Sequence, residues 1–171
     1  MQEIIYNEEN INDTEIDEIV IRTKGIIIND NNEILLGYCN KTYQFPGGHL
    51  EGKEDLYSCL KREVKEETGI VLTKEYSPFL VIKYYTRNYR NTTKTRLNKI
   101  YYYYIKENRT YSLSDMSLDK NEILGNYTLK YIKITNVKNL LKKTVKDNPI
   151  NKIIVKEMIT VLDKLKQIHY Y

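Results

Sequence analysis

The amino-acid sequence predicts an α/β protein, and three features indicate it. Several runs of β-branched and aromatic residues are typical of strands, whereas a central segment and the C-terminal segment carry apolar residues at helical spacing. Of the 171 residues, 41% are hydrophobic and 29% are charged, as in ordinary globular proteins. Because no Gly/Pro-rich hinge interrupts the chain, we expect one domain over residues 1–171, with an acidic N-terminal segment at 1–18 and a C-terminal helix at 148–168.

The N-terminal part of the chain predicts two strands and a loop. Residues 19–29 are rich in β-branched side chains and are expected to form a strand, which a turn at 30–32 connects to a second strand at 33–39. These two strands would form a hairpin. A loop then carries residues 43–48, in which Pro46 forces the preceding residue out of helical geometry and two glycines permit unusual backbone angles.

A central helix is predicted to begin near Glu54 or Asp55, whose carboxylates favour the positive end of a helix. Its apolar face consists of residues at i, i+3, i+4 and i+8: Leu56, Cys59, Leu60 and Val64. Gly69 is a suitable C-terminal stop. Because Cys39 and Cys59 have no histidine-rich segment near them, we expect free thiols in a reducing cytosol rather than a zinc site.

The second half of the chain predicts further strands. Residues 79–86 and 97–106 are apolar and aromatic, and a basic loop at 87–96 joins them. Four consecutive tyrosines, 101–104, lie in the second of these strands and are expected mainly to pack in the core. A further strand is expected at 127–134.

Two helices complete the predicted elements. Asn136 is the expected cap of a short helix at 137–145, and Asn148-Pro149 would open the last helix. The buried side of that helix is expected to consist of Ile150, Ile154, Met158, Val161 and Leu165. No apolar run approaches the ~20 residues needed to span a bilayer, and the N-terminus resembles neither a secretory nor a transit peptide. The sequence therefore indicates a cytoplasmic protein without a membrane segment.

Three carboxylates in the central helix carry the first chemical signal. Glu63, Glu66 and Glu67 are spaced i, i+3 and i+4, so they lie within one helical turn. They repel one another, and a helix that carries them needs a nearby cation. Oxygen ligands in this number suit a hard divalent ion such as magnesium or manganese. The alternative is a solvated, salt-bridged surface, the usual role of a run of charges.

The spacing around these carboxylates extends over residues 48–70, GHLEGKEDLYSCLKREVKEETGI. Its fixed positions are Gly48, Glu54, Arg62, Glu63, Val64, Glu66, Glu67, Gly69 and Ile70. With this spacing the chain resembles the Nudix hydrolases, whose signature it matches without a departure. The resemblance implies an α/β/α sandwich with a mixed β-sheet, and hydrolysis of a nucleoside diphosphate linked to another group.

The resemblance also implies a metal site. Glu63 and Glu67 correspond to the principal metal ligands, and Glu66 corresponds to a further or water-bridged ligand. The carbonyl of Gly48 corresponds to an additional oxygen ligand. The expected cofactor is Mg²⁺, with Mn²⁺ as the alternative.

Further catalytic roles follow from the same resemblance. Arg62 and Glu54 correspond to an internal pair, in which the arginine orients the catalytic glutamate and the outer glutamate holds the arginine. Glu63 is the first choice for the general base. Glu122, in a polar segment before the predicted strand at 127–134, is the alternative base, and a solvated loop acid is its competing interpretation.

Residues near the signature are candidates for substrate binding: Arg22, Phe45, His49, Tyr85 and Arg87. The aromatic side chains would stack on a base, and the basic ones would contact phosphate. His49 follows the glycine pair and is either a phosphate contact or an exposed turn residue. Lys24 and Lys41 are further candidates from the first strands.

Charge is distributed unevenly along the chain, whose net charge is +4. Residues 1–20 hold seven acids and no base, whereas residues 83–109 hold eight bases and one acid. An acidic metal-binding patch beside a basic segment suits a metal-bound phosphate ester. The basic loop either clamps a polyphosphate or an RNA 5′ end, or is a solvated hairpin tip. Pairing of the acidic segment with the basic segment of a second subunit would produce a homodimer.

The leading interpretation is a metal-dependent Nudix pyrophosphohydrolase that acts on a small soluble nucleotide. One alternative is a Nudix module that senses a nucleotide without hydrolysing it, although the complete set of signature carboxylates disfavours it. The other alternative is an RNA 5′-end pyrophosphohydrolase, whose binding would weaken steeply with salt.

Overall fold

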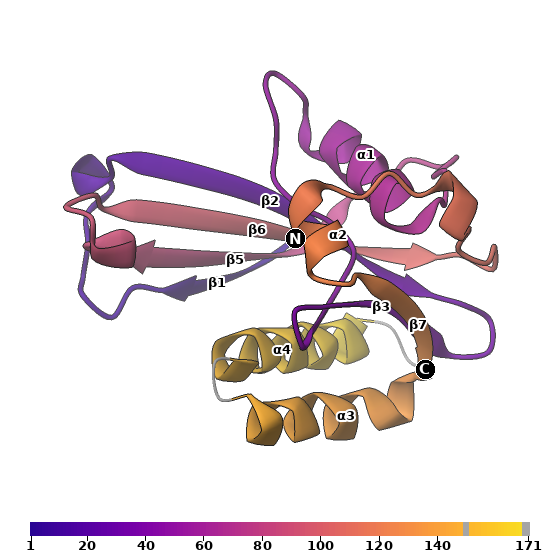
Figure 1. Cartoon of the computed structure of the whole chain (residues 1–171). Helices are drawn as coiled ribbons and strands as arrows, with labels where there is room; N and C mark the ends of the chain where they lie inside the picture. The colour runs from indigo at the N-terminus through magenta and orange to yellow at the C-terminus, as the bar shows by residue number, and fades with distance from the viewer. Residues whose placement is uncertain (149–150, 169–171) are drawn as a thin grey trace.

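The computed structural model describes residues 1–148 and 151–168, which build one mixed sheet with helices on both faces (Figure 1). The strands are β1 (Gln2–Tyr6), β2 (Glu18–Ile28), β3 (Glu33–Cys39), β4 (Thr42–Gln44), β5 (Pro78–Thr86), β6 (Arg96–Lys106) and β7 (Thr128–Lys133). The helices are α1 (Leu56–Thr68), α2 (Lys120–Leu124), α3 (Ile134–Asp147) and α4 (Lys152–Ile168).

The strand order is β1-β5-β6-β2-β3-β4, with β7 paired to β3. β1 runs parallel to β5, and β2 runs parallel to β6 along its whole length. The other pairs are antiparallel. The strands β1, β5, β6 and β2 together form an arm that extends beyond the helices (Figure 1).

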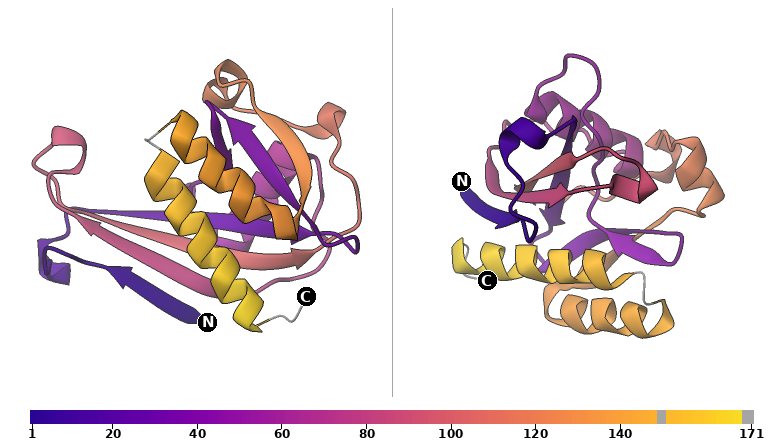
Figure 2. Two further views of the ribbon diagram at one scale, coloured as in Figure 1. Left: turned by 90° about the horizontal axis from the view of Figure 1, so that it is seen from below. Right: turned by 90° about the vertical axis from the view of Figure 1, so that its left-hand side faces the viewer.

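Two hydrophobic clusters fill the two faces of the sheet. On one face α1 packs through Leu60 and Val64 against strand residues that include Ile27 and Tyr103. On the other face α3 and α4, which lie side by side in Figure 2, pack through residues such as Val137, Leu141, Val155, Met158 and Leu165. The expected α/β/α sandwich with a mixed sheet is therefore confirmed.

Acidic residues of the N-terminal segment form ion pairs with basic residues of the arm in the same chain. Glu3 pairs with Lys83, and a carboxylate oxygen of Glu15 lies 2.7 Å from Nη2 of Arg87. Glu18, which lies opposite Arg96 in the sheet, approaches that guanidinium to 2.7 Å. With Glu9, which lies 3.7 Å from Nε of Arg87, four of the seven acids of residues 1–20 have a basic partner in their own chain.

The strands predicted at 19–29, 33–39, 79–86, 97–106 and 127–134 are confirmed to within one residue at each end. The predicted hairpin of the first two is correct only at its base, where Ile28 pairs with Ile34, because β2 otherwise pairs with β6 and β3 with β7. Tyr43 and Gln44, expected in a loop, belong to β4, which closes a tight turn onto β3. Strand β1 and helix α2 had no counterpart among the predicted elements.

The helices were predicted less evenly. The prediction for α1 is confirmed, because Asp55 caps it by accepting from the Ser58 N–H and Gly69 ends it with φ 72°. The predicted start of the helix at 137–145 is wrong: α3 begins at Ile134, directly after β7, and Asn136 lies inside it. The last helix begins by Lys152. Of its expected opening residues, Asn148 is instead the C-cap of α3, and Pro149 lies outside the described part of the chain. None of the helices in that part is both long and apolar enough to cross a membrane.

Candidate active site

A cleft of about 810 Å³ lies between α1, which carries the signature carboxylates, and one face of the arm strands β2, β5 and β6. Its acidic end is lined by Glu63 and Glu67 of α1 and by Glu122 of α2. Its floor consists of residues on one face of β2, β6 and β5, and residues of α4 line one side. Residues far apart in the sequence therefore meet around one space that is large enough for a nucleotide.

The loop after β4 brings its backbone against the acidic helix. Gly47 has φ 131°, a conformation that other residues avoid, and its N–H donates to Oε2 of Glu67 at 2.8 Å. A side chain at Gly48 would overlap the carboxylate of Glu63. The Gly48 carbonyl accepts from the Thr23 N–H at 3.0 Å, which fixes the loop to β2. The glycine pair therefore lets the loop touch both carboxylates.

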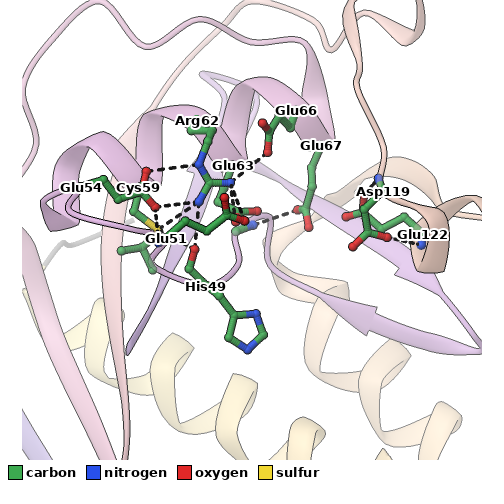
Figure 3. Close-up of polar contacts among 12 residues, drawn as sticks. His49, Glu51, Glu54, Cys59, Arg62, Glu63, Glu66, Glu67, Asp119 and Glu122 are labelled. Carbon is green, nitrogen blue, oxygen red and sulfur yellow. Dashed lines mark hydrogen bonds and ion pairs between the residues drawn. The ribbon is translucent and has the colours of Figure 1, made fainter. Parts of the chain in front are cut away.

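Arg62 organises the carboxylates of α1 (Figure 3). Its guanidinium holds Glu54 through two nitrogens, at 2.7 and 3.2 Å. Its Nη1 donates to Glu63 at 2.9 Å and to Glu66 at 3.0 Å. It also donates to the carbonyl of His49 at 2.9 Å. The Arg62 guanidinium thus holds all three carboxylates and the loop after β4 in a single network.

Glu67 is the most enclosed carboxylate of the site, with 4% of its surface exposed. Besides the Gly47 N–H, the hydroxyl of Tyr127 donates to its Oε2 at 3.2 Å. The carboxyl of Glu122 lies beside it, and Figure 3 shows Glu67 pointing towards α2. Burial, with a further contribution from Glu122, raises the pKa of Glu67 to about 8 although Lys24 and the Gly47 N–H oppose this. A buried carboxyl with a second carboxyl beside it is stabilised by a proton or by a cation.

The donor set fits a hard divalent cation. Within residues 1–148 and 151–168, no three acidic, imidazole or thiol side chains already converge as a finished metal cluster, because Arg62 draws Glu63 and Glu66 towards itself. Burial also raises the pKa of Glu63, although the neighbouring Arg62 and Lys24 oppose this. A divalent cation that replaces the proton on Glu67 would neutralise the buried carboxylates, and all of its ligands from these side chains would be oxygen atoms.

The structure brings some of the expected substrate residues into the cleft. Arg22 and His49 line it, and Nε of Arg22 donates to Nε2 of His49 at 2.9 Å, so this imidazole nitrogen is unprotonated. No ion pair found among the described residues includes Arg22, a half-buried guanidinium that is therefore available to an anion. Phe45 lines the floor but is 2% exposed and packs edge-on against Tyr102.

Other expected residues lie elsewhere. Of the described residues that line the cleft, none is Tyr85, Arg87 or Glu66. The Tyr85 hydroxyl donates to Asp13, and Arg87 pairs with Glu15. Glu66 contributes to the network of Arg62, and 38% of its side chain is exposed. Tyr85 and Arg87 therefore contact the N-terminal segment, whereas Glu66 contacts Arg62 within α1.

Sequence reasoning missed several residues that line the cleft or contact its carboxylates. Tyr127 precedes β7, and Glu157 comes from α4, so no spacing along the chain connects them to the signature. Asn98 is a polar residue beside Ile100 and Tyr102 on one face of β6 and offered a weak signal. Lys24, by contrast, was a candidate from the sequence and lines the cleft: its ammonium group donates to the Gly47 carbonyl and lies near Glu63 and Glu67.

Comparisons with known proteins agree on the family and the fold. A family model described as the NUDIX domain matches residues 21–149. The MutT protein from Bacillus halodurans is 19% identical, with a TM-score of 0.51, over 80% of this chain and 82% of that one. The binary complex of a C. elegans Ap4A hydrolase is 18% identical, with a TM-score of 0.51, over 87% of this chain and 96% of that one. At these identities the likeness to the two structures shows a shared fold.

Proposed function

Because the chain belongs to the family defined by the NUDIX domain, we propose that it is a Nudix pyrophosphohydrolase. Its substrate would be a nucleoside diphosphate linked to another group, and the reaction would cleave the phosphoanhydride bond. The observation that carries this proposal is the pair Glu63 and Glu67, whose pKa values are raised by burial, at one end of a nucleotide-sized cleft.

The proposed cofactor is Mg²⁺, which Mn²⁺ could replace. Glu63, Glu67 and the carbonyl of Gly48 would hold it, with Glu66 as a further ligand once Arg62 releases that carboxylate. When bound, the ion neutralises phosphate charge and activates the attacking water. The protein supplies the fixed positions of the oxygen ligands, which the Gly47 N–H and Tyr127 hold for Glu67.

The chain's own side chains divide the remaining tasks. Arg62, held in turn by Glu54, sets the orientation of Glu63, the first candidate for the base that takes the proton of the attacking water. Glu122 is the second candidate, because it lies beside Glu67 at the mouth of the same site. Arg22 and Lys24 face the cleft from β2, where they would contact the phosphates.

The structure gives less support to an RNA 5′ end as substrate. Five of the basic residues of segment 83–109 have acidic partners in the chain: Lys83, Arg87, Arg96, Lys106 and Arg109. A paired base contributes less to binding of a polyphosphate backbone. Hydrolysis of a 5′-triphosphate RNA that falls steeply between 50 and 200 mM salt, on the order of 10³-fold, would favour the RNA substrate over a small nucleotide.

A substrate panel tests the proposed function directly. Nucleotide sugars, dinucleoside polyphosphates, nucleoside triphosphates and capped RNA would each be incubated with the protein and Mg²⁺, and the released phosphate products would be identified. We expect at least one small nucleotide to be cleaved at an anhydride bond, and cleavage to stop with a chelator. A panel without any turnover would support the nucleotide-sensing alternative.

Divalent ions should stabilise the protein more strongly at pH 8.5 than at pH 6. The pKa of Glu67 rises from 4.5 to about 8 on folding, so this group's contribution to stability is full below pH 4.5 and is lost as the pH rises through 8. A bound cation displaces the same proton, so apparent metal affinity should rise about tenfold per pH unit below pH 8. Melting temperatures with and without MgCl₂ at the two pH values measure this.

The Glu67→Gln variant is the control, because it has no proton to displace at this position. Its melting temperature should respond weakly to MgCl₂ and without the difference between the two pH values. A wild-type protein that gains equal stability from MgCl₂ at pH 6 and pH 8.5 would contradict the assignment of Glu67 as the titrating ligand.

A further inference from the structure

The floor of the cleft contains a polar side chain that the proposed reaction does not use. Asn98 of β6 lines the cleft, is 8% exposed and therefore more than nine-tenths buried. Its amide oxygen has no hydrogen-bond partner among the described residues. A buried amide in this state is unfavourable for folding, so a ligand that satisfies it would recover the lost interaction.

A carboxylate faces the same part of the cleft from α4. Glu157 lines the cleft and accepts from the hydroxyl of Tyr102 at 2.6 Å. Tyr84, directly opposite Asn98 in the pairing of β5 with β6, is also close to Glu157, which together with burial raises the pKa of that phenol. Two tyrosines thus hold Glu157 in place, and a carboxylate retains free acceptor positions after two such contacts.

Apolar side chains border these two polar groups, and the guanidinium of Arg22 also lies near Glu157. Ile100 precedes Tyr102 on the same strand face, and Met158 and Ile153 of α4 border the same space. A mostly apolar pocket with a few fixed polar groups is typical of sites that recognise an aromatic ring and its polar edge. The acidic end and this apolar part belong to one continuous cleft, so a nucleotide could place its phosphates at one and its base at the other.

We propose that Asn98 and Glu157 form a base-recognition subsite that selects adenine. The inference rests on the proposed function, since it identifies the base of the nucleotide bound in the same cleft. An asparagine amide offers one donor and one acceptor side by side, which match the exocyclic amino group and a ring nitrogen of adenine. Glu157 offers acceptors only and would receive a second hydrogen of the amino group.

The experiment compares two ligands that differ only in that amino group. Adenosine 5′-monophosphate and purine riboside 5′-monophosphate contain no anhydride bond, so both can be titrated calorimetrically into the wild-type protein with Mg²⁺ without turnover. We expect the adenine nucleotide to bind about tenfold more tightly. In Asn98→Leu the two affinities should become equal, whereas Asn139→Leu, a matched change at an exposed position of α3, should keep the preference.

Stability measurements separate recognition from folding. Asn98→Leu replaces an unsatisfied buried amide by an apolar group of similar size, so its melting temperature should equal or exceed that of the wild type. Asn98→Ser provides a smaller substitution that should also abolish the preference. Equal binding of the two nucleotides by the wild type, absence of binding of both, or a preference retained in the Asn98 variants would overturn the inference.

The outcome is distinguishable from failure of the proposed function. If the substrate panel shows metal-dependent hydrolysis without preference for adenine, the adenine subsite is rejected and the pyrophosphohydrolase stands. If the panel shows no turnover while the adenine preference is present and depends on Asn98, the subsite stands and catalysis is rejected.

Discussion

Glu67→Gln should lower kcat by about 10³-fold and leave the fold intact. The substitution removes one negative charge from the proposed metal site, where the ion contributes several kcal/mol of transition-state stabilisation. Glutamine has nearly the same volume and can still accept from the Gly47 N–H and the Tyr127 hydroxyl. It also ends the repulsion with Glu122, so the melting temperature at pH 8 should be unchanged or higher.

Glu75→Gln is the matched control for this prediction, because Glu75 is an exposed acid outside the elements of the site. Its kcat, measured with the best substrate of the panel under saturating Mg²⁺, should equal that of the wild type. A Glu67→Gln enzyme with a kcat near normal under these conditions would show that the buried carboxylate is not a metal ligand.

Arg62→Ala should reduce both activity and stability. The guanidinium compensates Glu54 and Glu63, whose side chains are 16% and 12% exposed, and its removal leaves these charges without a partner. We expect unfolding in urea at pH 7.5 to become easier by about 3 kcal/mol, at the low end for a buried pair because 25% of the Arg62 side chain reaches solvent. Loss of the orientation of Glu63 should lower kcat by about 100-fold.

Arg109→Ala tests whether these effects are specific to the site. Arg109 also pairs with a glutamate, Glu107, but 48% of its side chain is exposed, so the loss should stay below about 1 kcal/mol. Arg62→Lys adds a second comparison, since an ammonium group cannot hold Glu54 with two nitrogens and reach Glu63 as well. If Arg62→Lys retained full kcat, the network of Arg62 would have only an electrostatic role.

Elements with local signals were predictable from the sequence. Helix α1 has both its cap, Asp55, and its stop, Gly69, within the segment itself, so its limits could be predicted closely. Helix α3 carries a misleading signal: Asn136 is a good capping residue, but Ile134 packs against the same hydrophobic cluster as Val137, and the helix begins there. Strand β1 has only five residues, and its partner β5 lies far along the chain.

The candidate site likewise combines residues that a local sequence pattern predicted and residues that no local pattern indicated. The spacing of Glu63, Glu66 and Glu67 along one helix predicted an acidic cluster, and the structure places two of these carboxylates in the cleft. Tyr127 and Glu157 come from other elements, and only the packing of the sheet against α1 and α4 brings them near. The substrate candidates Tyr85 and Arg87 lie at the end of β5, where they contact Asp13 and Glu15 of the N-terminal segment. No local sequence pattern shows this contact between distant segments.

The parallel pairing of β2 with β6 has a consequence for the order of folding. Glu18 and Arg96, whose side chains form an ion pair across β2 and β6, are 78 residues apart in the sequence. The paired strands β1 and β5 are separated by a similar interval. A ribosome must therefore add a further 78 residues after Glu18 before that residue can reach Arg96. High contact order of this kind predicts slow folding, with apolar strand edges accessible to chaperones until β6 emerges.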